Sequence, residues 1–76
     1  MKDLLIYVAK NLVDNPDEVS VNTIENDDSV TFELRVAQED MGKVIGRQGR
    51  IAKEIRTLMK AAGLKEDKKV TVDIVD

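Results

Sequence analysis

Two residue types with frequent chemical roles, cysteine and histidine, do not occur among the 76 residues of the sequence. Without cysteine there is no disulfide, thiolate nucleophile or cysteine metal ligand, which fits a reducing compartment. Without histidine the chain lacks the usual general base near neutral pH and the commonest metal ligand. The acids Asp27, Asp28, Glu66 and Asp67 lie in turn-like segments with no positioned base nearby. We therefore expect no enzymatic activity and no cofactor or metal site.

Long apolar runs are also missing. No stretch is long enough to cross a bilayer, and Asp3 interrupts the N-terminus in a way that is untypical of signal peptides. These features predict a cytoplasmic protein. The length predicts a single domain over residues 1–76, and a chain of this size buries only about 60% of the surface that its unfolded form exposes. Self-association would add to such a marginal stability.

Aromatic residues are limited to one tyrosine and one phenylalanine. Phe32 is most simply a core residue. A protein with so few aromatic side chains cannot read bases by stacking them in a row, as RRM or cold-shock sheets do.

Acids outnumber bases, and the resulting net charge of −3, taken alone, argues against a nucleic-acid partner. Its distribution argues the other way. From Met41 to Lys60 six bases stand against the single acid Glu54, so this segment carries +5 and the rest of the chain −8. The six are Lys43, Arg47, Arg50, Lys53, Arg56 and Lys60. Bases on the outer side of a helix are often only solvated, but a local excess is also how a protein attracts a polyanion.

The apolar periodicity predicts an α+β fold with the order α-β-β-α-α-β. A helix is predicted over Lys2 to Val13, with an apolar arc so wide that either deep burial or a protein contact explains it. Alternation predicts strands at Glu18 to Glu25 and Ser29 to Ala37, and the turn residues 26–28 join them as an antiparallel hairpin.

The second half of the chain predicts two more helices and a strand. The first helix lies within Gln38 to Ile45. Glu39 and Asp40 would lie in its first turn, where negative charge interacts favourably with the helix dipole. The second runs from Arg50 to Ala62, with Gly63 just past its end. Lys69 to Val75 alternates as a final strand. We expect a three-stranded sheet with all three helices on one face.

Two glycines, Gly46 and Gly49, enclose Arg47 and Gln48 between the two predicted helices. Glycine accepts positive φ and carries no side chain that would keep another backbone away. A tight turn at this point would leave amide groups free at the start of a helix, where a phosphate could bind. Two glycines at this spacing usually mean only a turn, but here the apolar Val44 and Ile45 precede them and bases lie on both sides.

This apolar pair, the G-x-x-G turn and the amphipathic helix that follows resemble the signature of the KH domain family. The element order is similar to that of the type II, prokaryotic-style KH fold. The resemblance implies a single KH domain that binds single-stranded RNA by clamping its phosphate backbone at the G-x-x-G loop. Carried onto this sequence, it implies that the RNA-binding residues are Lys43, Val44, Ile45, Gly46, Arg47, Gln48, Gly49, Arg50 and Lys53. Bases would lie against some of Val44, Ile45, Ile51 or Ala52 and against the neighbouring strand, where Leu34 and Val36 are the candidates, although most of these positions are also expected in the core.

The whole chain is similar to a set of small bacterial single-KH proteins. This resemblance implies an RNA chaperone or post-transcriptional regulator in the cytoplasm, linked to cell shape and cell wall biogenesis. It further implies a homodimer and a heteromer with a larger Jag-type KH protein. The alternative is a protein interaction module on a KH scaffold that binds RNA weakly or not at all, which the acidic remainder of the chain favours.

Overall fold

The structure is a computed structural model that describes residues 1–75. It begins with helix α1 (Lys2–Leu12) and a 3₁₀ turn, η1 (Pro16–Glu18). The hairpin of β1 (Ser20–Glu25) and β2 (Ser29–Arg35) follows, and then a second 3₁₀ turn, η2 (Gln38–Asp40). The remaining elements are α2 (Met41–Ile45), the 3₁₀ turn η3 (Arg47–Gly49), α3 (Arg50–Lys65) and β3 (Lys69–Val75). The predicted α-β-β-α-α-β order is therefore confirmed.

The three strands form one mixed sheet in the order β1-β2-β3. β1 pairs antiparallel with β2, so that Val21 lies opposite Leu34, which confirms the predicted hairpin. β3 pairs parallel with β2, and Phe32 lies opposite Val72. A parallel pair needs a long crossover connection, and α2 and α3 supply it. Because β2 is central, β1 and β3 both have a free edge.

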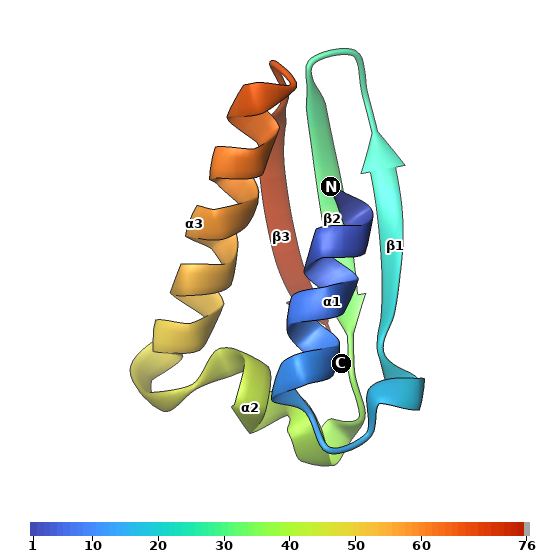
Figure 1. Ribbon diagram of the computed structural model, residues 1–76, viewed down its shortest axis with the longest axis vertical. Coiled ribbons are helices and arrows are strands. Elements are labelled where there is room, and N and C mark those ends of the chain that lie inside the picture. Colours follow the sequence, from blue (N-terminus) through green and yellow to red (C-terminus); the bar gives the residue numbers. More distant parts are fainter. Residues whose placement is uncertain (76) are drawn as a thin grey trace.

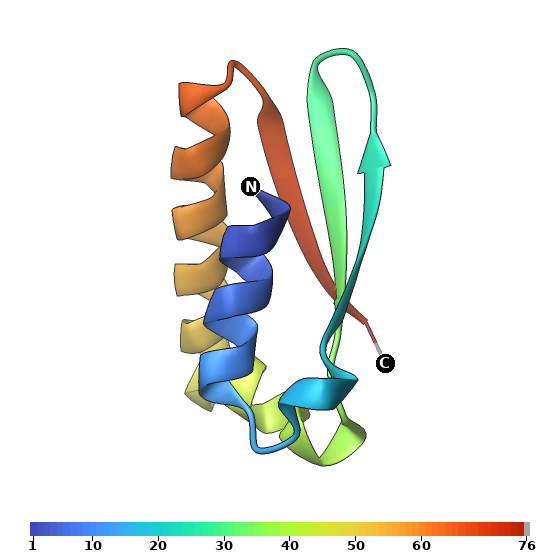
Figure 2. The ribbon, with the colours of Figure 1, turned by 45° about the vertical axis from the view of Figure 1, so that its right-hand side comes forward.

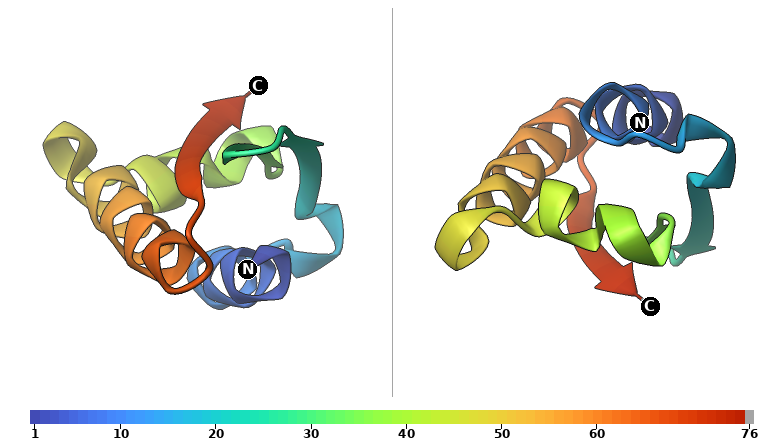
Figure 3. Two further views of the ribbon diagram at one scale, coloured as in Figure 1. Left: turned by 90° about the horizontal axis from the view of Figure 1, so that it is seen from above. Right: turned by 90° about the horizontal axis from the view of Figure 1, so that it is seen from below.

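The helices α1 and α3 cover the same face of this sheet, and α2 lies at its lower end in the view of Figure 1 (Figures 1 and 2). Seen along the sheet, one flank of α3 faces α1 and its other flank faces β3 (Figure 3). The core between the layers takes side chains from every helix and strand. Its largest fully buried side chains are Phe32, Leu5, Leu34, Met59, Val44 and Asp40.

The end of α3 differs from the prediction. The helix continues to Lys65, and Gly63 is a buried residue inside it, not the residue that follows its last turn. A Cβ built on Gly63 would collide with Cγ2 of Val70 and would lie 2.7 Å from the carbonyl oxygen of Lys68. Gly63 is thus required because β3 approaches the helix here, and Asp67 takes the positive φ, 56°, in the turn that follows.

Candidate nucleic-acid interface

The turn between α2 and α3 projects from one corner of the molecule, away from β1 (Figures 1 and 3). Gly46 donates its N–H to the carbonyl of Gly42 at 2.8 Å and so ends α2. Gly49 donates to the carbonyl of Gly46 at 3.2 Å and closes the turn. Among the hydrogen bonds within the turn, none uses the N–H groups of Arg47 and Gln48, and both residues are exposed. These two amides are therefore available to an anion from solvent.

The two glycines are needed for different reasons. Gly46 has φ 76° and ψ 176°, and a Cβ there would lie 2.6 Å from Cγ1 and 2.9 Å from the backbone N of Ile51. It therefore lets the turn pack against the first turn of α3. Gly49 has φ 76° and ψ 14°, in the left-handed region, but its Cβ would meet nothing within 4 Å. Of these two glycines, Gly49 is the one with open space at its Cβ position.

Three basic residues of the predicted site lie at this corner without an ion-pair partner among residues 1–75. Arg47, Arg50 and Lys53 are exposed, and none of them forms an ion pair with any residue in the described range 1–75. Gln48 is exposed as well and has φ 57°, a left-handed conformation that is uncommon outside glycine. The structure thus brings Arg47, Gln48, Gly49, Arg50 and Lys53 together around one exposed turn.

Lys43 has a different environment. Its Nζ lies 3.1 Å from Oδ2 of Asp14 and 3.8 Å from Oδ1 of Asp40. The hydrogen bond to Asp14 and the negative charges nearby raise the pKa of the Lys43 ammonium despite its partial burial. Its charge is therefore already matched by carboxylates of this chain.

Asp40 is the only fully buried charged residue in the part of the chain that the structure describes. Its carboxylate accepts hydrogen bonds from the backbone N–H of Asp14 at 3.3 Å and from the backbone and side chain of Asn15 at 2.9 and 3.0 Å. Burial opposes ionisation, but these bonds and the charge of Lys43 outweigh it and hold the pKa of Asp40 below its usual value. Asp40 was expected in the first turn of this helix, but it is the last residue of η2, just before α2, and its carboxylate anchors the loop after α1 against α2.

The apolar residues predicted to contact bases divide into two groups. The side chains of Val44, Leu34 and Ala52 are buried in the core, with exposed fractions of 4% or less, so they present little surface to a base in this conformation. They support the site from beneath. Ile45 is 38% exposed, and Ile51 and Val36 are half-buried, so these three can present apolar surface.

A groove of about 770 Å³ runs between α3 and the free edge of β3. Arg56, Lys60 and Leu64 line it from α3, and Val70, Val72 and Asp73 line it from β3. Arg56 reaches across, and its Nε donates to the carbonyl oxygen of Val72 at 3.1 Å. Arg56 and Lys60 belong to the basic segment 41–60 but lie outside the site that the resemblance implies. Their spacing from Lys53, three and seven residues, puts all three on one flank of the helix and was the available signal.

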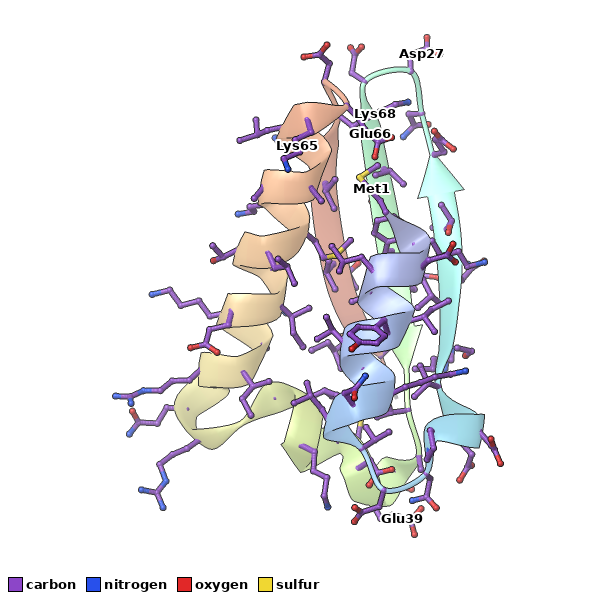
Figure 4. The ribbon with its side chains drawn as sticks, in the orientation of Figure 1. Met1, Asp27, Glu39, Lys65, Glu66 and Lys68 are labelled. Carbon is purple, nitrogen blue, oxygen red and sulfur yellow. The ribbon has the colours of Figure 1, made fainter. Side chains whose placement is uncertain are left out.

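Lys68 also lines the groove, at the end where the β1–β2 hairpin lies (Figure 4). Its Nζ donates to Oε2 of Glu25 at 3.2 Å and to the carbonyls of Asn26 and Asp27 at 3.3 Å each. Its ammonium therefore ties β3 to the hairpin. At the opposite end of the molecule, Glu39 lies in η2, just before α2 (Figure 4).

Metal-binding and membrane-spanning features are absent from residues 1–75. No group of three or more acids, histidines or cysteines is placed to hold a metal ion there. No helix in this range combines the length and apolarity that a bilayer crossing requires.

The sequence matches the model of a known family, described as KhpA/KhpB, KH domain, over residues 2–74. The chain belongs to this family. It is 57% identical over 75 residues to the RNA-binding protein KhpA of Clostridium perfringens, a match that covers 99% of this chain and 100% of that protein. Identity to the RNA-binding protein KhpA of Caldanaerobacter subterraneus is 61% over 75 residues, with the same coverage. The RNA-binding protein KhpA of Listeria monocytogenes is 50% identical over 76 residues, and the match covers both chains completely.

No solved structure matches the chain significantly. The fold seen here, with a mixed three-stranded sheet and the G-x-x-G turn between two helices, agrees with the type II KH arrangement expected from the sequence.

Proposed function

We propose that this protein is a single KH domain, over residues 1–76, that binds single-stranded RNA in the cytoplasm. The turn from Gly46 to Gly49 clamps the phosphate backbone through the amides of Arg47 and Gln48. Arg47, Arg50 and Lys53 add positive charge around that contact. The observation that supports this most is the combination of unused amides and unpaired cations at one exposed corner of a molecule whose net charge is −3. The names of its KhpA relatives point to the same ligand.

The RNA continues from the turn into the groove between α3 and β3. Arg50, at the first turn of α3, and Lys60 are separated by about 15 Å along the helix axis, at 1.5 Å per residue. This length suits the roughly four nucleotides that a KH domain holds. Lys53, Arg56 and Lys60 follow one another along that flank, so the path stays positive. Lys43 adds less to the contact than these cations, because its Nζ already lies 3.1 Å from Asp14 and 3.8 Å from Asp40.

A clamp of this kind suits an RNA chaperone or post-transcriptional regulator, since it grips the backbone of many sequences. Phosphate contacts also make the affinity depend on salt. If about three phosphates are neutralised, the affinity falls about 20-fold between roughly 50 and 200 mM salt, using the slope for single strands.

The experiment that tests the clamp is Gly49→Asp, measured with a fluorescent single-stranded oligonucleotide of about eight residues at low salt. The new carboxylate would stand where the phosphate approaches. Its Cβ meets nothing within 4 Å, so the only strain is the positive φ of 76°, a conformation that Asp adopts more readily than most residues. We expect binding to weaken at least about tenfold, because a like charge at the contact costs more than one unit of log affinity. Ser20→Asp, on exposed β1, adds the same charge far from the turn and is the matched control. Equal affinities of the two variants would contradict the proposed clamp.

We further propose that two copies associate through an apolar surface formed by Leu4 and Tyr7 of α1 and Leu58 of α3. These side chains are 37%, 68% and 41% exposed. A hollow between the two helices lies beside them, and Met1, Lys65 and Glu66 surround its upper end (Figure 4). The same surface would serve in a heteromer with a larger Jag-type KH protein. Leu58→Glu should produce a monomer in sedimentation experiments, whereas Leu64→Glu, the same change outside this surface, should not.

The alternative function is a protein interaction module with little RNA binding, and the same apolar surface favours it. Under that alternative no single-stranded oligonucleotide would bind even at low ionic strength, while Leu58→Glu would still abolish association.

A further inference from the structure

The outer side of α3 carries four exposed residues at heptad spacing, and together they form what we call the α3 seam: Glu54, Leu58, Ala61 and Lys65. Their separations of four, three and four residues are those of successive a and d positions in a coiled coil. At about 100° per residue, the four side chains lie within an arc of about 60°. Leu58 also belongs to the apolar surface formed with Leu4 and Tyr7, so the seam extends that surface along α3.

The two ends of the seam carry opposite charges that the chain itself does not pair. Glu54 and Lys65 are both exposed, and neither forms an ion pair with any residue in the described range 1–75. They are separated by roughly 16 Å along the helix axis, at 1.5 Å per residue, so they cannot pair with each other. A helix that covers the seam is therefore favoured if its own charges run in the opposite order.

A second copy of the chain has that order of charges when its α3 runs antiparallel. If the twofold axis passes between Met59 and Lys60, Leu58 of each copy faces Ala61 of the other copy. The same axis places Glu54 of each copy against Lys65 of the other. One arrangement thus covers the apolar side chains and pairs the charges, and the twofold symmetry makes each contact occur twice.

The shape of the surface beside the seam suits this arrangement. Ala61 is small, and it lines a hollow of about 300 Å³ between α1 and α3 together with Leu4 and Leu58. The side chain of Leu58, which is 41% exposed, can enter the hollow of the other copy as a knob enters a hole. A parallel pair of α3 helices would instead bring Glu54 against Glu54 and Lys65 against Lys65, and facing like charges are unfavourable.

The seam lies apart from the proposed RNA path. Lys53, Arg56 and Lys60 are at least about 80° around the helix from every residue of the seam, at about 100° per residue. A copy that covers the seam therefore leaves this basic flank of α3 open. Association and RNA binding can be measured separately.

Resting on the proposed association of two copies, we infer that they pair through antiparallel α3 helices, with Glu54 of each copy bound to Lys65 of the other. The order of charges along α3 makes the seam complementary to itself. It therefore selects a second copy of this chain in one orientation, which the apolar residues alone would not define.

The test reverses each charge alone and then combines the changes. Glu54→Lys brings a lysine against the partner's Lys65, and Lys65→Glu brings a glutamate against the partner's Glu54, at two symmetric contacts in each case. Each variant should weaken association about tenfold or more in sedimentation equilibrium at low salt, because two attractive pairs become repulsive. An equimolar mixture of the two variants should associate again, since opposite charges then meet at both contacts. The double variant Glu54→Lys/Lys65→Glu should associate as the unchanged protein does.

The matched controls are Glu18→Lys on η1 and Lys69→Glu on β3, which make the same charge changes at exposed positions outside the seam. Neither should alter association, alone or mixed, and circular dichroism checks that every variant is folded. Single seam variants that associate as tightly as the unchanged protein would overturn the inference and leave association through Leu58 intact. So would a mixture, or a double variant, that associates no better than the single variants. If the unchanged protein is a monomer, the proposed association fails and this inference fails with it.

Discussion

The two glycines of the turn should respond very differently to alanine. Gly46→Ala places a methyl group 2.6 Å from Cγ1 of Ile51 and 2.9 Å from its backbone nitrogen. The turn would also require the new alanine to adopt φ 76° and ψ 176°, a combination found almost only in glycine. Gly49→Ala forces only a left-handed conformation, and its methyl group meets open space.

These differences can be turned into free energies of unfolding. A glycine-only conformation costs about 1–3 kcal/mol and a forced overlap in a packed site about 1–3 kcal/mol, so Gly46→Ala should cost roughly 2–6 kcal/mol. Gly49→Ala should cost about 1–2 kcal/mol. A domain of this size has a total stability of roughly 4–11 kcal/mol, so Gly46→Ala removes a large share of it. The corresponding fall in Tm is about 4–8 °C for each kcal/mol.

Urea unfolding followed by far-ultraviolet circular dichroism measures both values in the same buffer, and equal slopes would show that the two variants unfold alike. Equal costs for the two substitutions would refute this account of the turn. So would a cost of less than about 1 kcal/mol for Gly46→Ala, the least that the overlap alone should require. The result also decides which glycine is suited to functional tests, because a loss of RNA binding in an unfolded variant carries no information about the clamp.

Three further predictions concern other parts of the structure. Lys43→Met should weaken RNA binding less than about twofold in the anisotropy assay, whereas Arg50→Met should weaken it several-fold, because only Lys43 is paired with Asp14. Asp40 has a lowered pKa in the folded state, so its contribution to stability is present above its ordinary value of 3.8 and is lost as the pH falls below it. Urea midpoints should therefore fall more steeply below pH 4 in the unchanged protein than in Asp40→Asn. Gly63→Ala should lower the free energy of unfolding by about 1–3 kcal/mol through overpacking, measured by urea unfolding.

Each of these three has a clear contrary result. Equal losses of RNA affinity in Lys43→Met and Arg50→Met would mean that the ion pair with Asp14 does not hold in solution. Parallel pH profiles would show that the Asp40 carboxylate is not the titrating group. An unchanged urea midpoint for Gly63→Ala would mean that β3 can move away from α3 without loss.

Much of the architecture could be predicted because it depends on neighbours in the sequence. The alternation over Ser29 to Ala37 and the turn residues before it predicted the hairpin, in which β2 ends at Arg35, and the period of apolar residues predicted α3. The G-x-x-G turn was predicted because its glycines, bases and apolar pair are adjacent. The side chains of Arg47, Arg50 and Lys53 are exposed there, as a solvated corner requires.

Other features could not be predicted because they depend on segments that meet only in the folded chain. A glycine at position 63 is typical of the end of a helix. Only the approach of Val70 explains why it lies inside the helix. Lys43 counts as a free base until Asp14 is placed beside it. Arg56 is one base among six until the edge of β3 supplies the Val72 carbonyl.

The order of amino acids alone therefore established where the helices, strands and glycine turn lie and which segment carries the positive charge, since these follow from interactions within a few residues. The packing of α1, α3 and β3 decided which charges are already neutralised, which apolar side chains are covered and which backbone groups face the groove. The physical reason is that burial, ion pairing and hydrogen bonding of this kind join residues distant in the chain, and their partners are defined only by the tertiary structure.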